Sequence, residues 1–123
     1  MNKILIVEDE ISSAEMLTFV LKEEGYFVAV AANGKEALAA LRENSIDLVL
    51  CDLMMPVMDG RELCRAMKLD PSMQSIPIVI MSAAPEISVS HLADEGCEYA
   101  CFMRKPLDLD LLATTIRNLV TTS

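Results

Sequence analysis

Five chemically capable side chains in this sequence lie at or just after the end of a short apolar run. They are three carboxylates, one hydroxyl and one ammonium group: Glu8, Asp9, Asp52, Ser82 and Lys105. Three neighbouring carboxylates repel one another, and a ligand set rich in oxygen and free of sulfur suits Mg²⁺. Beside such a metal, Asp52 could act as a nucleophile toward a phosphoryl group whose oxygens Lys105 and Ser82 would help to hold. These residue types predict a metal-dependent phosphoryl site, provided that the fold brings them together.

Each of these residues also has an ordinary structural use. Aspartates flank strands as turn formers, Lys105-Pro106 can simply end a strand, and Ser82 can begin a helix. Taken singly, each residue would be assigned a structural role. Chemistry is favoured because all five stand at the ends of predicted neighbouring strands.

The strand that ends in Asp52 is the one around which the site is organised. Four apolar residues run between Asp47 and Asp52, which indicates a strand buried on both faces, as in a parallel sheet. Asp52 then lies at the carboxyl end of that strand, the edge at which open α/β sheets bind ligands. The following loop contains Pro56 and Gly60, which suit a turn into a helix.

Apolar runs and helical periodicity alternate along the whole chain. Strands are predicted at 3–7, 26–31, 47–52, 76–81 and 100–103, and helices at 11–25, around 37–41, 63–70, 86–95 and from Asp108 onward. Such alternation with short connections predicts right-handed crossovers. The expected fold is a single α/β domain: a doubly wound five-stranded parallel sheet with five helices on its two faces. The carboxyl ends of its strands would share one edge and bring the five side chains together.

Composition limits the function classes. The 123 residues fit one domain, and a net charge of −9 disfavours direct binding to nucleic acid. The apolar runs are too short to cross a membrane, and no signal peptide is visible, so we expect a cytoplasmic protein that does not bind membranes. The four cysteines contain no Cys-x-x-Cys pair and are interpreted as small buried thiols; His91, the single histidine, is interpreted as a surface helix residue.

Four segments of the chain resemble the receiver domain of two-component response regulators. They are residues 4–10 (ILIVEDE), residues 52–60 (DLMMPVMDG), Met81-Ser82-Ala83 and Lys105-Pro106. The resemblance spans essentially residues 1–123 and implies the strand order 2-1-3-4-5. It also implies a phosphorylation-controlled signalling switch, which catalyses its own phosphotransfer and dephosphorylation without being an enzyme in the usual sense.

The resemblance gives each site residue an expected role. Asp52 matches the phosphoacceptor, which takes a phosphoryl group from a phosphohistidine on a sensor histidine kinase or a histidine phosphotransfer protein. Asp9 matches the direct Mg²⁺ ligand, Glu8 a ligand acting through water, and Asp52 with the backbone carbonyl of Met54 completes the protein ligands. Lys105 matches the lysine that pairs with the phosphate.

Switching residues are implied in the same way. Ser82 matches the switch hydroxyl, Ala83 the small residue that leaves room for the phosphoryl group, and Phe102 the switch aromatic. The segment between Gly96 and Lys105 is about two residues longer than the family spacing. Either the loop before the last strand is longer, or that strand is bulged and Tyr99 takes part instead.

Output and lifetime follow from the resemblance as well. Phosphorylation is expected to change the face made by the helix at 86–95, the strand at 100–103 and the last helix, where an unknown downstream protein or a second copy would bind. The positions that set the dephosphorylation rate are Met54 and Ala84, neither of which can orient a water, so slow loss of phosphate is expected. The chain could be a stand-alone regulator or the first domain of a longer one.

Four other functions fit the sequence less well. A receiver-like interaction module that works without phosphorylation is the main alternative, although every site residue is present. A haloacid-dehalogenase-like phosphatase would need an aspartate at Met54, and a flavodoxin phosphate would be repelled by residues 8–10. A nucleotide-binding phosphate loop is excluded because Ala29 stands where its first glycine belongs before Gly34-Lys35.

Overall fold

The computed structural model describes residues 2–83 and 96–121. In this part of the chain a five-stranded parallel sheet has the order β2-β1-β3-β4-β5, as the resemblance implied. The elements in chain order are β1 (Lys3–Val7), α1 (Ile11–Glu23), β2 (Phe27–Ala31), α2 (Gly34–Glu43), β3 (Leu48–Asp52), α3 (Gly60–Leu69), β4 (Ile78–Ser82), β5 (Cys101–Arg104) and α5 (Leu109–Thr121). The helix predicted at 86–95, with His91, lies outside the described residues.

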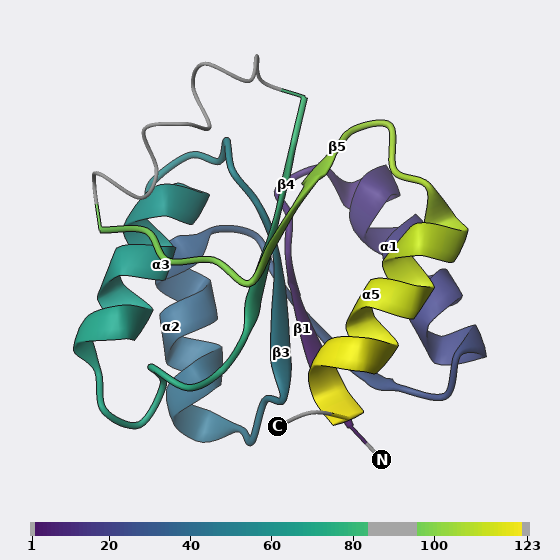
Figure 1. Cartoon of the computed structure of the whole chain (residues 1–123). Coiled ribbons are helices and arrows are strands. Elements are labelled where there is room, and N and C mark those ends of the chain that lie inside the picture. The colour runs from purple at the N-terminus through teal and green to yellow at the C-terminus, as the bar shows by residue number, and fades with distance from the viewer. Residues whose placement is uncertain (1, 84–95, 122–123) are drawn as a thin grey trace.

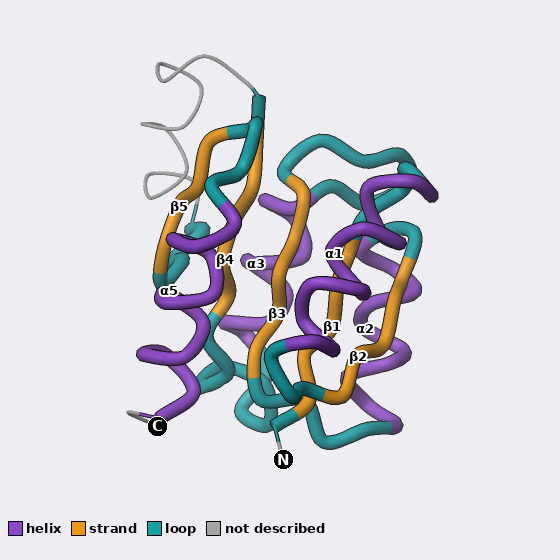
Figure 2. The backbone as a smooth tube through the Cα atoms, turned by 90° about the vertical axis from the view of Figure 1, so that its right-hand side faces the viewer, coloured by secondary structure: helices purple, strands orange, loops and turns teal. Residues whose placement is uncertain are grey.

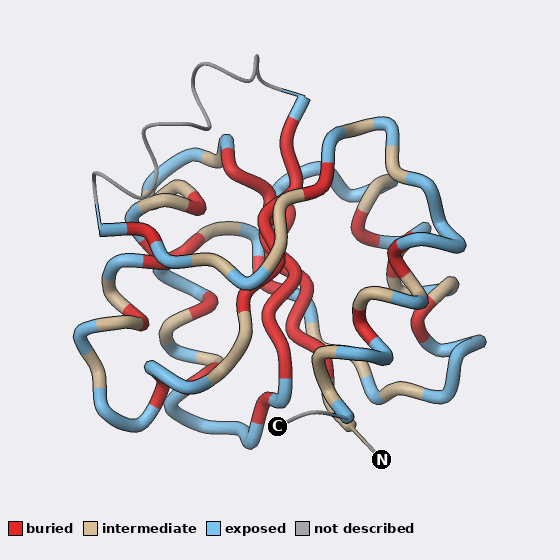
Figure 3. The backbone as a smooth tube through the Cα atoms, viewed as in Figure 1, coloured by how far each residue is buried: buried red, intermediate tan, exposed pale blue. Residues whose placement is uncertain are grey.

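Helices cover both faces of the sheet (Figure 1). Helices α2 and α3 lie on one side, and α1 and α5 on the other; Figure 2 shows the latter pair in front of the strands. The strands supply side chains to both layers in alternation: Leu5 and Val7 belong to the core cluster under α2 and α3, whereas Ile4 and Ile6 belong to the cluster under α1 and α5. The central strands are consequently buried on both sides (Figure 3), which confirms the doubly wound α/β fold.

Two helices begin earlier than apolar periodicity indicates, because polar side chains cap them. Asn33 accepts a hydrogen bond from the Glu36 backbone N–H, so α2 starts at Gly34. Asp59 and Glu62 form a reciprocal capping box, so α3 starts at Gly60. The sequence contains both capping signals, and they define these starts better than the first apolar residue does.

The other helix ends follow the sequence prediction closely. Gly25 follows α1 with φ of 93°, a left-handed conformation that suits glycine. The Asp108 side chain accepts hydrogen bonds from the backbone N–H groups of Asp110 and Leu111, which confirms its role as the cap of α5.

Four of the five strands begin one or two residues later than predicted, because the preceding residues belong to turns and connections. The Tyr26 backbone N–H donates to the Leu21 carbonyl at the end of α1, and the Ile76 N–H donates to the Met73 carbonyl. Asp47 instead uses its side chain to accept from the Lys3 backbone N–H at 2.8 Å. Ser82 is the last residue of β4 rather than the residue after it.

Strand β5 pairs with β4 one residue to one, from Val79 with Cys101 through Ser82 with Arg104. A bulge would place two residues of β5 opposite one residue of β4. The bulged-strand alternative is therefore wrong for the described strand, and Tyr99 lies in the connection that precedes it. No helix among the described residues has both the length and the apolar character needed to cross a membrane.

Candidate phosphoryl and metal site

The carboxyl ends of four strands place the predicted side chains at one edge of the sheet. Glu8 directly follows β1, and its backbone N–H extends the ladder to the Ala31 carbonyl at 2.9 Å. Asp52 is the last residue of β3, and Ser82 is the last residue of β4. Lys105 follows β5, where its backbone N–H donates to the Ser82 carbonyl at 2.9 Å. Main-chain pairing thus determines where each of these side chains starts.

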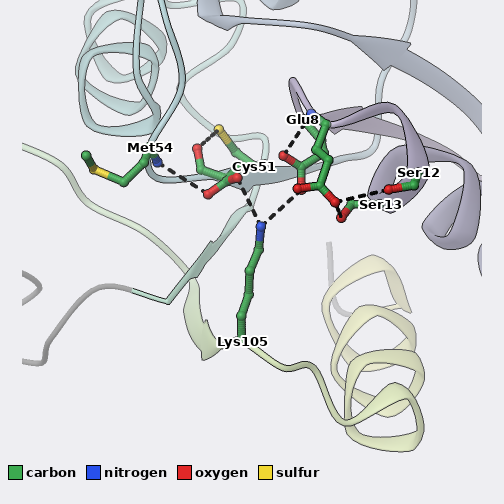
Figure 4. A network of polar contacts seen from close by, with 8 residues as sticks. Glu8, Ser12, Ser13, Cys51, Met54 and Lys105 are labelled. Carbon is green, nitrogen blue, oxygen red and sulfur yellow. Dashed lines mark hydrogen bonds and ion pairs between the residues drawn. The ribbon is translucent and has the colours of Figure 1, made fainter.

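Lys105 joins the two buried carboxylates of the site. Its Nζ atom lies 3.0 Å from Glu8 Oε1 and 3.0 Å from Asp52 Oδ2. Figure 4 shows the Lys105 side chain extended toward Glu8 from the opposite side of the site. Glu8 and Asp52 are 3% and 8% exposed, so one ammonium group faces two carboxylates largely withdrawn from water. The sequence prediction paired Lys105 with a phosphate; in the structure the lysine contacts the two carboxylates.

Burial alters the proton affinities of this group. Burial first, and then the neighbouring Asp52, raise the pKa of Glu8 to about 7, against the lowering effect of Lys105. For Lys105, burial disfavours the charged form, but the hydrogen bonds to Asp52 and Glu8 outweigh it and raise its pKa. The raised pKa of Glu8 means that Lys105 only partly offsets the cost of burying this carboxylate beside Asp52.

The third carboxylate completes a possible cation site. Glu8, Asp9 and Asp52 each offer an oxygen, and these oxygens lie within 4.8 Å of one another. Asp9 is exposed whereas the other two are buried, so a bound ion would face the protein on one side and solvent on the other. An all-oxygen set open to water fits Mg²⁺, which keeps several of its waters.

The β3–α3 loop lies close against the phosphoacceptor candidate. The Met54 backbone N–H donates to Asp52 Oδ1 at 3.3 Å, while the Met54 side chain points away into solvent and is 67% exposed (Figure 4). A Cβ atom on Gly60 would lie only 2.6 Å from the Asp52 carbonyl oxygen, so glycine is required for this approach. Val57 has φ of 68°, in a γ-turn closed by the Met58 N–H and the Pro56 carbonyl at 2.7 Å.

The glycines and the γ-turn were not identified as site residues from the sequence. Gly34, the first residue of α2, donates its backbone N–H to the Met58 carbonyl at 3.0 Å and would clash with the Met58 side chain if it carried a Cβ. This contact holds the β3–α3 loop against α2. The signal available in the sequence was glycine itself at the start of each helix.

Around the switch position, the structure locates some predicted residues and omits one. Ser82 is fully buried, and Ala83 is exposed directly after it. Phe102 lies in β5 and packs with Tyr99 against the core cluster under α2 and α3, with ring centroids 6.3 Å apart. Ala84 falls outside the described residues.

Cysteine placement agrees with the sequence interpretation. Cys51, Cys64 and Cys97 are buried and Cys101 is partly buried, and all four are free thiols. The described His, Cys, Asp and Glu residues form one group with ligand atoms close enough for a metal, and it contains no sulfur.

Residues 4–117 match the family described as the response regulator receiver domain. The chain belongs to this family. The receiver domain of response regulators is a phosphorylation-controlled switch of two-component systems, so the family supports the overall function that the acidic cluster and lysine suggest.

Solved structures agree with the family in fold. The receiver domain of a signal transduction histidine kinase from Syntrophus aciditrophicus superposes with a TM-score of 0.93 at 34% identity, covering 99% of this chain and 92% of that chain. The chemotaxis response regulator CheY4 of Vibrio cholerae gives a TM-score of 0.87 at 28% identity, covering 97% and 98%.

Curated relatives are much longer than this receiver domain. The DNA-binding response regulator MtrA of Mycolicibacterium paratuberculosis is 48% identical over 82 residues, which are 67% of this chain and 35% of that protein. The transcriptional regulatory protein ZraR of Klebsiella oxytoca is 41% identical over 116 residues, 92% of this chain and 25% of that protein. The chain thus spans about a third or less of the length of these relatives.

Proposed function

We propose that residues 1–123 act as a receiver domain in which Asp52 accepts a phosphoryl group from a phosphohistidine. The supporting observation is the arrangement of Asp52, which stands at a strand end within 3.0 Å of Lys105 and in reach of two further carboxylates. In the reaction, an Asp52 carboxylate oxygen forms a bond to phosphorus as the bond from phosphorus to the histidine nitrogen breaks. The nitrogen keeps the bonding electron pair and is released as imidazole.

Glu8, Asp9, Asp52 and the Met54 carbonyl are the proposed holders of Mg²⁺, with Glu8 acting through water. The metal would neutralise charge on the transferring phosphoryl oxygens. Lys105 would exchange its contact with the Asp52 carboxylate for one with the new phosphoryl group, because that group carries about −1.5 to −2 charge. The same arrangement would support the domain's own phosphotransfer and dephosphorylation.

Ser82, Ala83 and Phe102 are the proposed switch residues. Ser82 would donate a hydrogen bond to the phosphoryl group, which Ala83 leaves room to enter, and Phe102 would respond at β5. The β5 and α5 surface, where a depression of about 300 Å³ is lined by residues that include Phe102 and Leu111, would then bind its target differently. The target is a downstream protein or a second copy of the chain.

The phosphoryl donor would be a sensor histidine kinase or a histidine phosphotransfer protein, as two-component relatives imply. MtrA is described as a DNA-binding response regulator, but the part of it that matches this chain is only 35% of its length. Because the net charge of −9 repels a phosphate backbone, we assign DNA contact in any longer protein to residues other than these 123.

Intact-mass analysis after treatment with acetyl phosphate and Mg²⁺ tests the assignment. The protein should gain one phosphoryl group, and Asp52→Asn should gain none. Asp47→Asn is the matched control, since Asp47 precedes the same strand at its other end and should leave labelling intact. Persistence of the adduct in Asp52→Asn would refute the phosphoacceptor, and an unlabelled protein would favour the interaction module that works without phosphorylation.

A further inference from the structure

Two cysteines that are distant in sequence meet beneath the surface near α3. Cys64 lies on α3 and Cys97 follows Gly96, and both are fully buried in the same core cluster. The Cys64 Sγ atom donates to the backbone carbonyl oxygen of Glu98, the residue next to Cys97, at 3.4 Å. This contact does not involve the carboxylate site.

We propose that Cys64 and Cys97 are a redox-active pair that closes to an intramolecular disulfide when the protein meets a peroxide. The bond would tie α3 to the segment that leads into β5. Figure 1 shows this segment crossing beside α3 on its way to β5.

The positions of the two sulfurs favour bonding between them. A disulfide needs the sulfurs about 2.05 Å apart, and the Cys64 Sγ atom already lies 3.4 Å from the backbone carbonyl oxygen of Glu98, the residue next to Cys97. The surrounding backbone is in place for this approach, because a Cβ on Gly96 would lie 3.7 Å from the Arg65 side chain. Residues 96–98 therefore rest against the turn of α3 that carries Cys64.

The pKa values of the two thiols are shifted in opposite directions, as such a reaction needs. The hydrogen bond from Cys97 lowers the pKa of Cys64, with a further contribution from Lys68, although burial opposes it. The same hydrogen bond, followed by burial, raises the pKa of Cys97. For Cys51 burial raises the pKa strongly. Cys64 is thus the nucleophile and Cys97 the thiol that resolves the intermediate.

Access requires only a local movement. Gly96, Glu98 and Ala100 are exposed on either side of the buried Cys97, so this connection lies at the surface of the molecule. Displacement of this short connection admits a small oxidant without opening the sheet.

The reaction proceeds in two balanced steps with hydrogen peroxide. The Cys64 thiolate attacks one peroxide oxygen, the O–O bond breaks, and the released hydroxide takes a proton, which leaves a sulfenic acid and water. The Cys97 sulfur then attacks the Cys64 sulfur, the S–O bond breaks, and a second water leaves with the Cys97 proton. Two thiols are oxidised and one peroxide is reduced.

Thiol counting and peptide mapping of the peroxide-treated 123-residue protein test this pairing. After unfolding, maleimide should label two fewer cysteines than in the untreated protein, and digestion without reductant should yield a peptide joining Cys64 to Cys97. Dithiothreitol should restore both labels. The oxidised protein should also unfold at a temperature roughly 10 °C higher, because the bond closes a long loop.

Variants provide the matched control. Cys64→Ser and Cys97→Ser should each abolish the cross-link, whereas Cys101→Ser should retain it. The cross-linked peptide of the unmodified protein decides the question even where a serine variant folds poorly. A cross-link through Cys51, a bond between two chains, or oxygen adducts with no cross-link would each overturn the proposal.

Discussion

The two ends of strands β1 and β3 carry similar polar groups in opposite surroundings. At the amino end, the Lys3 Nζ atom donates to Asn44 Oδ1 at 3.1 Å, and the Lys3 backbone N–H donates to Asp47, both in exposed contacts. At the carboxyl end, Lys105 contacts Glu8 and Asp52 at similar distances, but both carboxylates are buried. Charges interact weakly in water and strongly where water is excluded. Burial, rather than the kind of contact, separates the proposed reactive edge from the opposite edge of the sheet.

We expect the largest difference between the two ends when one lysine is removed from each. Lys105→Met takes away the cation that faces the proposed phosphoacceptor, so we expect phosphorylation of Asp52 by acetyl phosphate to slow by about 100-fold. Lys3→Met should change the rate less than about 2-fold, because its contacts are exposed and distant. Time courses of intact mass measure both rates, and equal slowing in the two variants would contradict the comparison.

A methyl group added to a glycine at each end is the next test. Gly60→Ala places a Cβ 2.6 Å from the Asp52 carbonyl and should lower the free energy of unfolding by about 2 to 3 kcal/mol. Gly25→Ala meets open space and carries only the strain of φ at 93°, about 1 kcal/mol. Urea unfolding of both variants measures the difference. A larger loss of unfolding free energy in Gly25→Ala than in Gly60→Ala would show that the loop beside Asp52 shifts at little cost to make room for the added methyl group.

The stability of the protein should depend on pH through Glu8, the buried carboxyl at the carboxyl end of β1. Its pKa is about 7 in the folded protein, against the ordinary value of 4.5 for a glutamate side chain in water. Between these pH values the folded state holds a proton that the unfolded state has lost, so stability falls as pH rises through this window and then stays constant.

The metal-free protein should therefore be less stable than Glu8→Gln at pH 8 by on the order of 2 kcal/mol, and about equal to it near pH 4. Denaturant unfolding at a series of pH values gives this difference directly. Parallel curves for the two proteins would mean that Glu8 keeps an ordinary proton affinity.

The lifetime of the phosphorylated state tests whether a side chain beside Asp52 can orient an attacking water. Met54 is exposed and apolar beside Asp52, so it cannot orient an attacking water, and the phosphorylated state should last minutes or longer. Met54→Asn should speed phosphate loss by roughly 5-fold, through hydrogen bonding to that water. Met54→Leu, which stays apolar, is the control. Loss within seconds from the unmodified protein would disprove the argument about water access.

The smallest expected effect concerns backbone strain next to the site. Val57, with φ of 68°, is a branched residue in a region that asparagine tolerates better. Val57→Asn should raise the free energy of unfolding by about 0.5 to 1 kcal/mol, whereas Val57→Ala should raise it less. Thermal unfolding compares the two variants, and a loss of stability in Val57→Asn would mean that the valine side chain contributes more than its strain removes.

Much of this arrangement is determined by the sequence itself. Four apolar residues before Asp52 specify a buried strand, and alternation with helical periodicity specifies a parallel sheet with a common carboxyl edge. Asn33 and Asp59 are capping residues that mark the starts of α2 and α3 in the sequence. These features depend on neighbours a few residues apart, so local rules identify them.

Tertiary structure decided which distant groups touch. Lys105 meets Glu8 and Asp52 across 97 and 53 residues of chain, because the carboxyl ends of β1, β3 and β5 share one edge of the sheet. The one-to-one register of β5, which rules out the bulge considered from the sequence, is set by its pairing with β4. The meeting of Cys64 with Cys97 likewise follows from how the chain crosses α3 on its way to β5. Periodicity determines which face a residue occupies, but only the packed sheet determines which residue of another element lies opposite it.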